Sequence, residues 1–178
     1  MARKSYNLPN HAHYLTFSCY KRQKLLTSDV LRERLVEIWV KACTEGDFAV
    51  WAYVIMPEHA HLLIYPRKEQ YEVSKILRLL KERFARWVVR KWKDHSPHLL
   101  EQIVVIRGQR TLHRCWQEGG GYDKNVHEFN AISRIIEYIE FNPVRRGLVK
   151  DPLEWKWSSA RLRAGEGNVE WDNDKSVL

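Results

Sequence analysis

A chain of 178 residues suits one domain with a single core, and its 30 Lys and Arg against 22 Asp and Glu give a formal net charge of +8. A basic balance of this size favours a polyanionic partner, most often nucleic acid. The three cysteines are too far apart for a disulfide framework or a zinc site, and no apolar run reaches membrane-spanning length. We therefore expect a cytoplasmic protein that does not contact a membrane.

The N-terminal third of the chain predicts one strand followed by one helix. Residues 13–20 alternate between a polar side, which includes Tyr14 and Thr16, and an apolar side, as a half-buried strand does. A helix should begin near Ser28 and run to about Thr44, because capping residues precede apolar residues at helical spacing.

Two more strands, residues 48–56 and 61–65, flank a Pro-Glu turn and should form an antiparallel pair. His59 and His61 lie close to this turn, separated by one small residue. Alternate side chains of a strand share a face, so the two imidazoles would point the same way and Ala60 would point into the opposite layer. The pair could therefore offer two neutral nitrogen ligands to one metal ion.

A second His-x-His string, His11 and His13, lies near the start of the first strand. No comparable turn or apolar run surrounds it. We interpret these two residues as surface histidines or DNA contacts and not as metal ligands.

A long amphipathic helix is predicted over residues 73–92. Its apolar stripe should be buried, whereas Lys81, Arg86 and Arg90 belong to its basic surface. Such a helix can lie along a phosphate backbone, which makes these three residues candidates for DNA binding; the alternative is a solvated basic face.

The rest of the chain predicts one more helix. Residues 103–106 could form a short strand or part of a linker, and Gly119–Gly121 resemble a flexible joint. Isoleucines at core spacing predict a helix over residues 127–142, which Pro143 ends. The order of elements fits an α+β fold, a ferredoxin-like (RRM-like) split-βαβ sandwich with an antiparallel sheet and helices packed on one face.

Tyr138 and Asn142 are four residues apart on this last helix, so their side chains share one flank. A phenol in this position could lie against a metal held by His59 and His61, and Asn142 would offer an oxygen one turn later. From spacing alone, Tyr138 could also be an ordinary tyrosine at the boundary of the core.

Two motifs resemble the signatures of single-tyrosine DNA transposases. Residues 56–63, Met-Pro-Glu-His-Ala-His-Leu-Leu, are similar to the His-hydrophobic-His motif, and residues 138–149 are similar to the motif Tyr-Ile-x-x-Asn-Pro-Val-(basic)-x-Gly. Trp116-Gln117 and the Trp-Ser-Ser-Ala string 157–160 also match the usual layout of the group. The branch that the chain resembles is the REP-associated tyrosine transposases of bacteria, within the HUH endonuclease superfamily.

The resemblance implies a metal-dependent single-stranded DNA endonuclease and strand-transferase that cleaves near hairpin-forming repeats through a covalent 5′-phosphotyrosine. Tyr138 would be the nucleophile, and His59, His61 and Asn142 would hold a divalent ion, Mg²⁺ or Mn²⁺. The Gly-rich segment 119–124 departs from the family pattern and leaves Tyr122 as the second candidate nucleophile.

Further expectations follow from the same resemblance. Arg145 and Arg146 would hold scissile-strand phosphates, or form a solvated basic turn, and Glu58 would orient an imidazole, or be a solvated carboxylate. Residues 1–163 would form the nuclease domain, and residues 164–178 a polar tail. The partner would be single-stranded or hairpin DNA near the bacterial nucleoid, bound by a monomer or a homodimer.

Two alternatives come from other functional classes. The chain could be a non-catalytic single-stranded nucleic-acid-binding module derived from a transposase, because a ferredoxin-like sheet with exposed aromatics can bind single strands without chemistry. A hydrolase that activates water on a His-bound metal is the weaker alternative, since no carboxylate cluster is evident.

Overall fold

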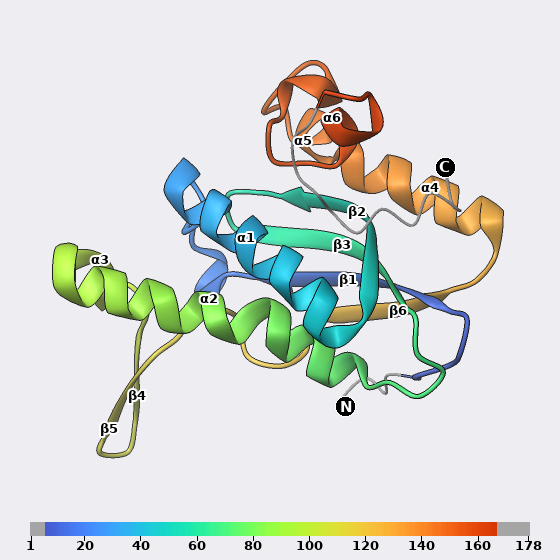
Figure 1. The fold of residues 1–178 in the computed structure, drawn as a ribbon. Coiled ribbons are helices and arrows are strands. Elements are labelled where there is room, and N and C mark those ends of the chain that lie inside the picture. Colours follow the sequence, from blue (N-terminus) through green and yellow to red (C-terminus); the bar gives the residue numbers. More distant parts are fainter. Residues whose placement is uncertain (1–5, 167–178) are drawn as a thin grey trace.

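The computed structural model describes residues 6–166, and four antiparallel strands in the order β2-β3-β1-β6 form its main sheet (Figure 1). The sheet strands are β1 (Ala12–Ser18), β2 (Phe48–Ile55), β3 (His59–Pro66) and β6 (Tyr122–Val126). A separate hairpin contains β4 (Val104–Arg107) and β5 (Arg110–His113). The longer helices are α1 (Asp29–Gly46), α2 (Val73–His95) and α4 (Phe129–Glu140), and the short ones are α3 (Pro97–Glu101), α5 (Asn142–Arg145) and α6 (Ala160–Arg163).

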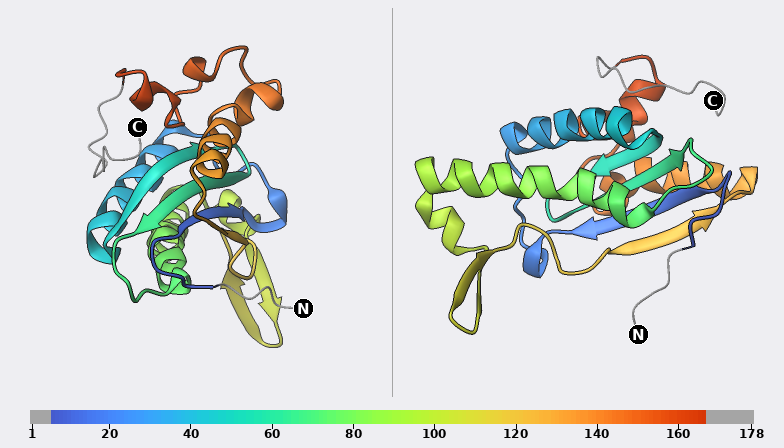
Figure 2. Two further views of the ribbon diagram at one scale, coloured as in Figure 1. Left: turned by 90° about the vertical axis from the view of Figure 1, so that its right-hand side faces the viewer. Right: turned by 60° about the horizontal axis from the view of Figure 1, so that its bottom comes forward.

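Helices α1 and α2 cover one face of the sheet, and the main core lies between them and the strands (Figures 1 and 2). Leu15 and Phe17 of β1, with Leu62 and Ile64 of β3, point into this core, as the alternation along each strand requires. Each helix links two parallel strands of the sheet, with a third strand between them, which is the split-βαβ arrangement. The predicted α+β sandwich with an antiparallel sheet is confirmed.

The opposite face of the sheet carries a second, smaller core under α4. Val54 and Leu63 from the sheet pack against Ile132 and Ile139 of the helix. The prediction placed helices on one face only, and α4 adds a partial layer on the other. The isoleucines at helical spacing give α4 an apolar stripe that must be buried. Because α1 and α2 already cover one face of the sheet, this stripe packs on the other face.

The Gly119–Gly121 segment leads directly into β6, which pairs with β1. Gly121 has φ +79°, and a Cβ on it would collide with the carbonyl oxygen of Thr16. Glycine is therefore required where the two backbones approach each other. Residues 103–106, which the sequence left open between strand and linker, belong to the β4–β5 hairpin.

His13 is fully buried, so its interpretation as a surface histidine was wrong. It lies on the same side of β1 as Leu15, under α2. Its Nδ1 is 2.8 Å from Asp123 Oδ1 and its Nε2 is 2.7 Å from the Tyr71 hydroxyl. Both partners come from distant parts of the chain, which the local sequence does not reveal. His11 stacks on the His127 ring, with centroids 4.6 Å apart.

Across residues 6–166, no helix has both the length and the apolarity to cross a bilayer. Of the predicted polar tail, residues 164–178, the part from 167 onward lies outside the described residues.

Candidate active site

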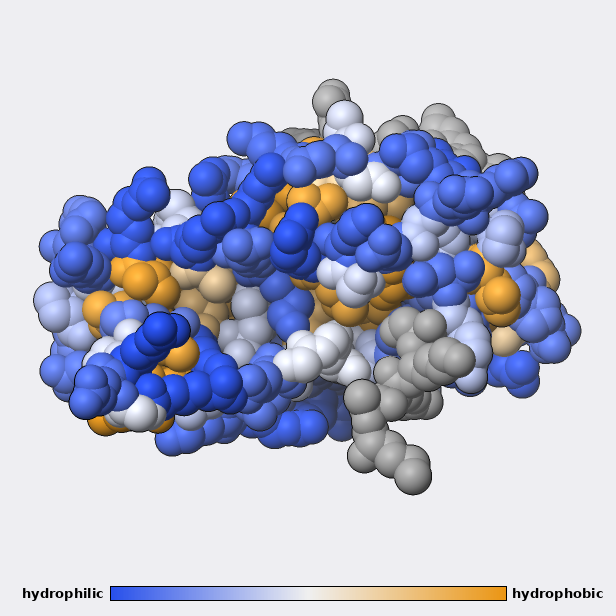
Figure 3. Space-filling view, turned by 90° about the horizontal axis from the view of Figure 1, so that it is seen from below, coloured by the Kyte–Doolittle hydropathy of each residue, from blue (hydrophilic) through white to orange (hydrophobic). Residues whose placement is uncertain are grey.

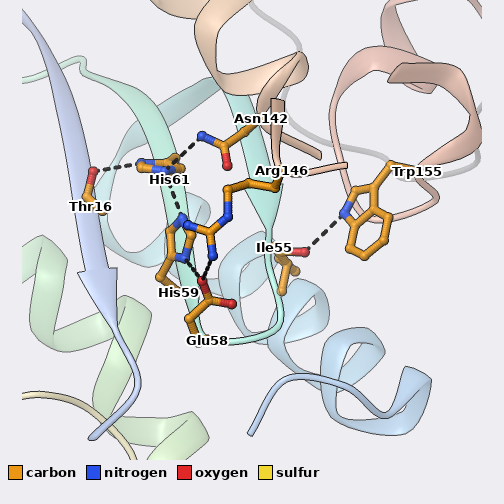
Figure 4. Close-up of polar contacts among 8 residues, drawn as sticks. All are labelled: Thr16, Ile55, Glu58, His59, His61, Asn142, Arg146 and Trp155. Carbon is orange, nitrogen blue, oxygen red and sulfur yellow. Dashed lines mark hydrogen bonds and ion pairs between the residues drawn. The ribbon is translucent and has the colours of Figure 1, made fainter. Parts of the chain in front are cut away.

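His59 and His61 point from β3 to the face of the sheet that carries α4, while Ala60 points into the main core. Their Nε2 atoms are 3.0 Å apart, with ring centroids at 4.7 Å and planes at 84° (Figure 4). Both side chains are largely buried. The predicted pair is therefore brought together at one point, as the alternation of the strand requires.

Two hydroxyl groups of β1 fix the far side of the His61 ring. The register of β1 and β3 pairs Thr16 with His61, and Thr16 Oγ1 lies 2.7 Å from His61 Nδ1. The Tyr14 hydroxyl lies 2.9 Å from the same nitrogen. In the tautomer in which Nδ1–H donates to the Thr16 oxygen, the lone pair of Nε2 is free to bind a cation.

Burial keeps both imidazoles neutral. Desolvation, followed by the proximity of His59, lowers the pKa of His61 to about 3. Desolvation also lowers the pKa of His59, against the opposing effect of the neighbouring Glu58 carboxylate. Neutral imidazole is the form that binds metal ions.

Asn142, the first residue of α5, brings its amide to the same point. Its Nδ2 is 3.3 Å from His61 Nε2, while its Oδ1 is buried and has no hydrogen-bond partner among residues 6–166. Within that range no group of three or more His, Cys, Asp or Glu side chains is arranged to hold a metal ion. A third protein ligand beside the two histidines would thus be of another type. A buried amide oxygen without a partner fits this role.

Tyr138 lies on α4 at the edge of this site. Its ring meets the His61 ring edge-on, with centroids 5.8 Å apart, and its side chain is 41% exposed, so a large substrate could reach it. The Arg145 guanidinium carbon lies 4.7 Å from the centre of the Tyr138 ring. Tyr138, His61 and Asn142 thus come together from a strand and two helices.

The second candidate nucleophile, Tyr122, lies on β6 opposite Thr16. Its ring contacts Tyr14, at 5.6 Å between centroids, and Tyr14 also contacts the Tyr138 ring at 6.2 Å. Burial raises the pKa of Tyr14 itself to about 12, which makes it a poor source of phenolate. The structure therefore brings the rings of Tyr14 and Tyr138 against His61 and places Tyr122 against Tyr14.

Comparison with known proteins settles the family. The model of the family described as "Transposase IS200 like" matches residues 7–105, more than half of the chain. The chain belongs to the IS200-like transposase family. The matched segment includes His59 and His61 and ends before Tyr138.

Two relatives have names that agree with this family. The chain is 23% identical over 147 residues to a Haemophilus influenzae protein named as a REP-associated tyrosine transposase, covering 83% of this chain and 78% of the relative. A solved REP-associated tyrosine transposase bound to a REP hairpin has a TM-score of 0.71, with 20% identity over 100% of this chain and 93% of the relative. The resemblance seen in the sequence is confirmed, and the solved structure shows the same fold.

Glu58 links the histidine pair of this IS200-like transposase to the C-terminal segment. Its Oε1 lies 3.2 Å from His59 Nδ1 and accepts a hydrogen bond of 3.0 Å from an Arg146 guanidinium nitrogen (Figure 4). The carboxylate is 7% exposed, so it is not a solvated turn residue. Arg146 thereby connects the end of α5 to the strand that carries the histidines.

A buried polar contact holds α4 against β2. Glu140 is 8% exposed, and its Oε1 accepts hydrogen bonds from Ser159 Oγ at 2.7 Å and from Arg163 Nε at 3.2 Å. Ser159 Oγ also accepts a 3.1 Å bond from the backbone N–H of Tyr53 in β2. The Trp-Ser-Ser-Ala string noted in the sequence thus fixes the helix that carries Tyr138.

Ser159→Ala should lower the free energy of unfolding by about 1–3 kcal/mol, because it removes one bond from a buried carboxylate and one from a buried backbone N–H. The midpoint of thermal unfolding should fall by about 2–10 °C. Urea unfolding followed by circular dichroism measures the change. Ser133→Ala, on the exposed side of α4, is the matched control and should stay within about 0.5 kcal/mol. Equal effects of the two substitutions would contradict this account of how α4 is held.

The basic residues of α2 lie away from the histidine pair, because α2 packs on the opposite face of the sheet. Lys81 Nζ donates to the Gly119 carbonyl oxygen at 3.0 Å, and burial lowers its pKa. Arg86 pairs with Glu82 at 3.4 Å, and Arg90 is exposed. The structure does not bring these predicted DNA contacts together with Tyr138 and the histidines.

Sequence reasoning did not assign roles to Tyr14, Thr16 and Arg146 in the environment of the imidazoles. The alternation of β1 does place Tyr14 and Thr16 on one side of the strand. Only the register with β3, which pairs Thr16 with His61, shows that this is the side of the histidines.

Proposed function

We propose that this transposase cleaves and rejoins single-stranded DNA beside a hairpin, through a covalent bond between DNA and Tyr138. The observation that carries the proposal is the contact of the Tyr138 ring with His61, whose Nε2 faces that of His59 at 3.0 Å. A partly exposed nucleophile and a buried pair of neutral nitrogen donors thus lie side by side on the face of the sheet that carries α4.

Single-stranded or hairpin DNA is the proposed substrate. The net charge of +8 favours a polyanion, and the relative of the same fold was solved with a REP hairpin. Arg145 and Arg146 are exposed and flank the site, so we assign them to phosphates next to the scissile bond. Lys81, Arg86 and Arg90 would contact DNA that passes to the other face. Binding to DNA would place the protein at the nucleoid.

His59, His61 and Asn142 would hold a divalent ion, Mg²⁺ or Mn²⁺. Two imidazole nitrogens and one amide oxygen are neutral, so they would leave the charge of the ion uncancelled. A half-turn of the Asn142 amide would exchange its nitrogen for the oxygen that now has no partner. When bound, the ion would supply Lewis acidity toward a non-bridging phosphate oxygen.

Tyr138 would attack the phosphorus of the scissile phosphodiester. Its hydroxyl oxygen would lose its proton to water and form a bond to phosphorus while the bond between phosphorus and the 3′ oxygen breaks. The 3′ oxygen would take a proton from water, which leaves a 5′-phosphotyrosine and a free 3′-hydroxyl. Arg145, whose guanidinium carbon lies 4.7 Å from the centre of the phenol ring, would hold the phosphate beside the attacking oxygen. One phosphoester bond replaces another, so reversal can rejoin the ends without ATP.

The tyrosine and the histidines of the site meet within one chain, so we propose action in cis, by a monomer or within a homodimer. Tyr138, on α4, contacts His61 of the same chain. Gly121 lies where the backbone before β6 approaches β1 closely.

The test is a covalent adduct. The protein is incubated with a radiolabelled hairpin oligonucleotide that has a single-stranded foot, in Mg²⁺ or Mn²⁺, and run on a denaturing gel. We expect a slowly migrating protein–DNA species that depends on the metal. Hairpin binding without an adduct in either metal would instead support the non-catalytic binding module.

Glu58→Gln should weaken the binding of Mn²⁺ by about 10- to 100-fold, the usual effect of removing a group that orients a histidine ligand. Isothermal titration calorimetry with the metal alone measures this. Glu69→Gln, in the exposed turn after β3, is the matched control and should bind Mn²⁺ as the unchanged protein does. An unchanged affinity in Glu58→Gln would show that the carboxylate does not act on the metal site.

A further inference from the structure

The β4–β5 hairpin, residues 104–113, projects from the body of the molecule, and we call it the arm. Its two strands pair with each other and with no other strand among residues 6–166. In Figure 1 the arm points down and away from the sheet, and both views of Figure 2 show the same separation. An isolated two-stranded hairpin has only marginal stability in water. The arm lies outside the packed core, so its strands add little to the stability of the fold.

The surface of the arm combines apolar and basic side chains. Ile106 is 75% exposed and Leu112 is 38% exposed. Arg107 and Arg110 face each other at the tip, and Arg107 is held by two bonds of 2.7 and 2.8 Å to the Glu118 carboxylate. Arg110 makes no ion pair within the described part of the chain. In Figure 3, where the arm points toward the viewer, strongly hydrophilic side chains border hydrophobic ones.

The base of the arm lies at the same end of the sheet as the histidine pair. Just after the arm, the Gln117 N–H donates to the Ser18 carbonyl oxygen at 2.8 Å, and Trp116 forms a β-bridge with Cys19. Ser18 in turn pairs with His59. Two strand spacings, about 10 Å, therefore separate the His59 backbone from Gln117, four residues beyond the arm.

We propose that the arm binds the duplex stem of the hairpin DNA and so sets the distance from the stem to the cleavage site. Arg110 would contact a phosphate, and Ile106 would lie against the groove. A two-stranded ribbon fits the major groove, and an arm of about 13 Å reaches along about four base pairs. This inference rests on the proposed function.

The composition of the arm favours a duplex over a single strand. Unpaired bases are bound by stacking on aromatic rings, and residues 104–113 include no Phe, Tyr or Trp. The two arginines at the tip would also repel their counterparts if two arms met tip to tip, which argues against a second copy of this chain as the partner.

The test compares Arg110→Ala with the unchanged protein by fluorescence anisotropy on two oligonucleotides. One has a hairpin stem and a single-stranded foot, and the other has the same foot and a stem sequence scrambled so that it cannot pair. We expect hairpin affinity to fall by about 5- to 10-fold and the slope of log K against log salt to lose about one unit. Affinity for the unpaired oligonucleotide should not change. Lys68→Ala, an exposed cation on the turn before α2, is the matched control and should alter neither.

An equal loss on both oligonucleotides, or no loss on either, would overturn the proposal. Ile106→Thr keeps the β propensity of the arm and should also weaken only hairpin binding. If this variant instead dissociates a dimer seen by sedimentation and leaves hairpin affinity unchanged, the arm binds another copy and the proposal is wrong. Adduct formation on the hairpin oligonucleotide is measured in the same samples; its absence from the unchanged protein would refute the proposed chemistry without affecting the comparison of affinities.

Discussion

Tyr138→Phe is expected to lower covalent attachment to DNA by at least about 10³-fold, because it removes the only atom of that side chain that can attack phosphorus. Hairpin binding should stay within about twofold, since the ring that packs on His61 and lies under Arg145 is retained. A denaturing gel measures the adduct, and an anisotropy titration measures the binding.

The two neighbouring tyrosines provide the controls. Tyr122→Phe should form the adduct at nearly the normal rate, because Tyr122 contacts the site through Tyr14. Tyr14→Phe should still form the adduct, but about 10-fold more slowly. The Tyr14 hydroxyl contacts His61 Nδ1, and about 10-fold is the smallest effect usually seen when a group that orients a metal ligand is removed. Loss of the adduct in Tyr122→Phe, with persistence in Tyr138→Phe, would transfer the role of nucleophile to Tyr122.

His59→Ala and His61→Ala should each lower metal-dependent cleavage by more than about 100-fold. This loss is larger than the roughly 10- to 100-fold expected for residues that only orient a metal ligand. Each substitution removes one of two nitrogens that converge to 3.0 Å, so excess Mg²⁺ or Mn²⁺ should not restore activity. Calorimetric titration with Mn²⁺ should show that binding is lost together with cleavage.

His11→Ala is the control for these two substitutions and should retain both metal binding and cleavage. His13, although it belongs to the same His-x-His string, cannot serve, because it is fully buried between Asp123 and Tyr71 and its removal would perturb the fold. Cleavage that survives in both His59→Ala and His61→Ala would contradict the proposed metal site.

Most of the fold that positions the site could be predicted from local patterns. The alternation in β1 and β3 and the isoleucine spacing of α4 each follow from burying one face of an element, so they appear directly in the sequence. His59 and His61 were predicted to share a face because strand geometry leaves no other choice. Tyr138 and Asn142 were predicted to share a flank, and the structure brings both to His61.

The features that the sequence did not predict depend on distant partners. β6, with the sequence Tyr-Asp-Lys-Asn-Val, has little of the composition of a strand and is one because β1 offers it a free edge. His13 is buried because Asp123 and Tyr71 satisfy both of its nitrogens. The bond of Arg146 to Glu58 likewise joins residues 88 positions apart.

Mapping of the DNA-linked peptide tests the central claim most directly. The adduct formed with hairpin DNA is treated with nuclease and then trypsin, and the peptide that carries the residual nucleotide is sequenced by mass spectrometry. The three tyrosines of this cluster fall in different tryptic peptides: Tyr138 in residues 135–145, Tyr122 in residues 115–124 and Tyr14 in residues 5–21. We predict that the nucleotide is attached to Tyr138 in peptide 135–145. A nucleotide on either of the other two peptides would contradict the assignment of the nucleophile.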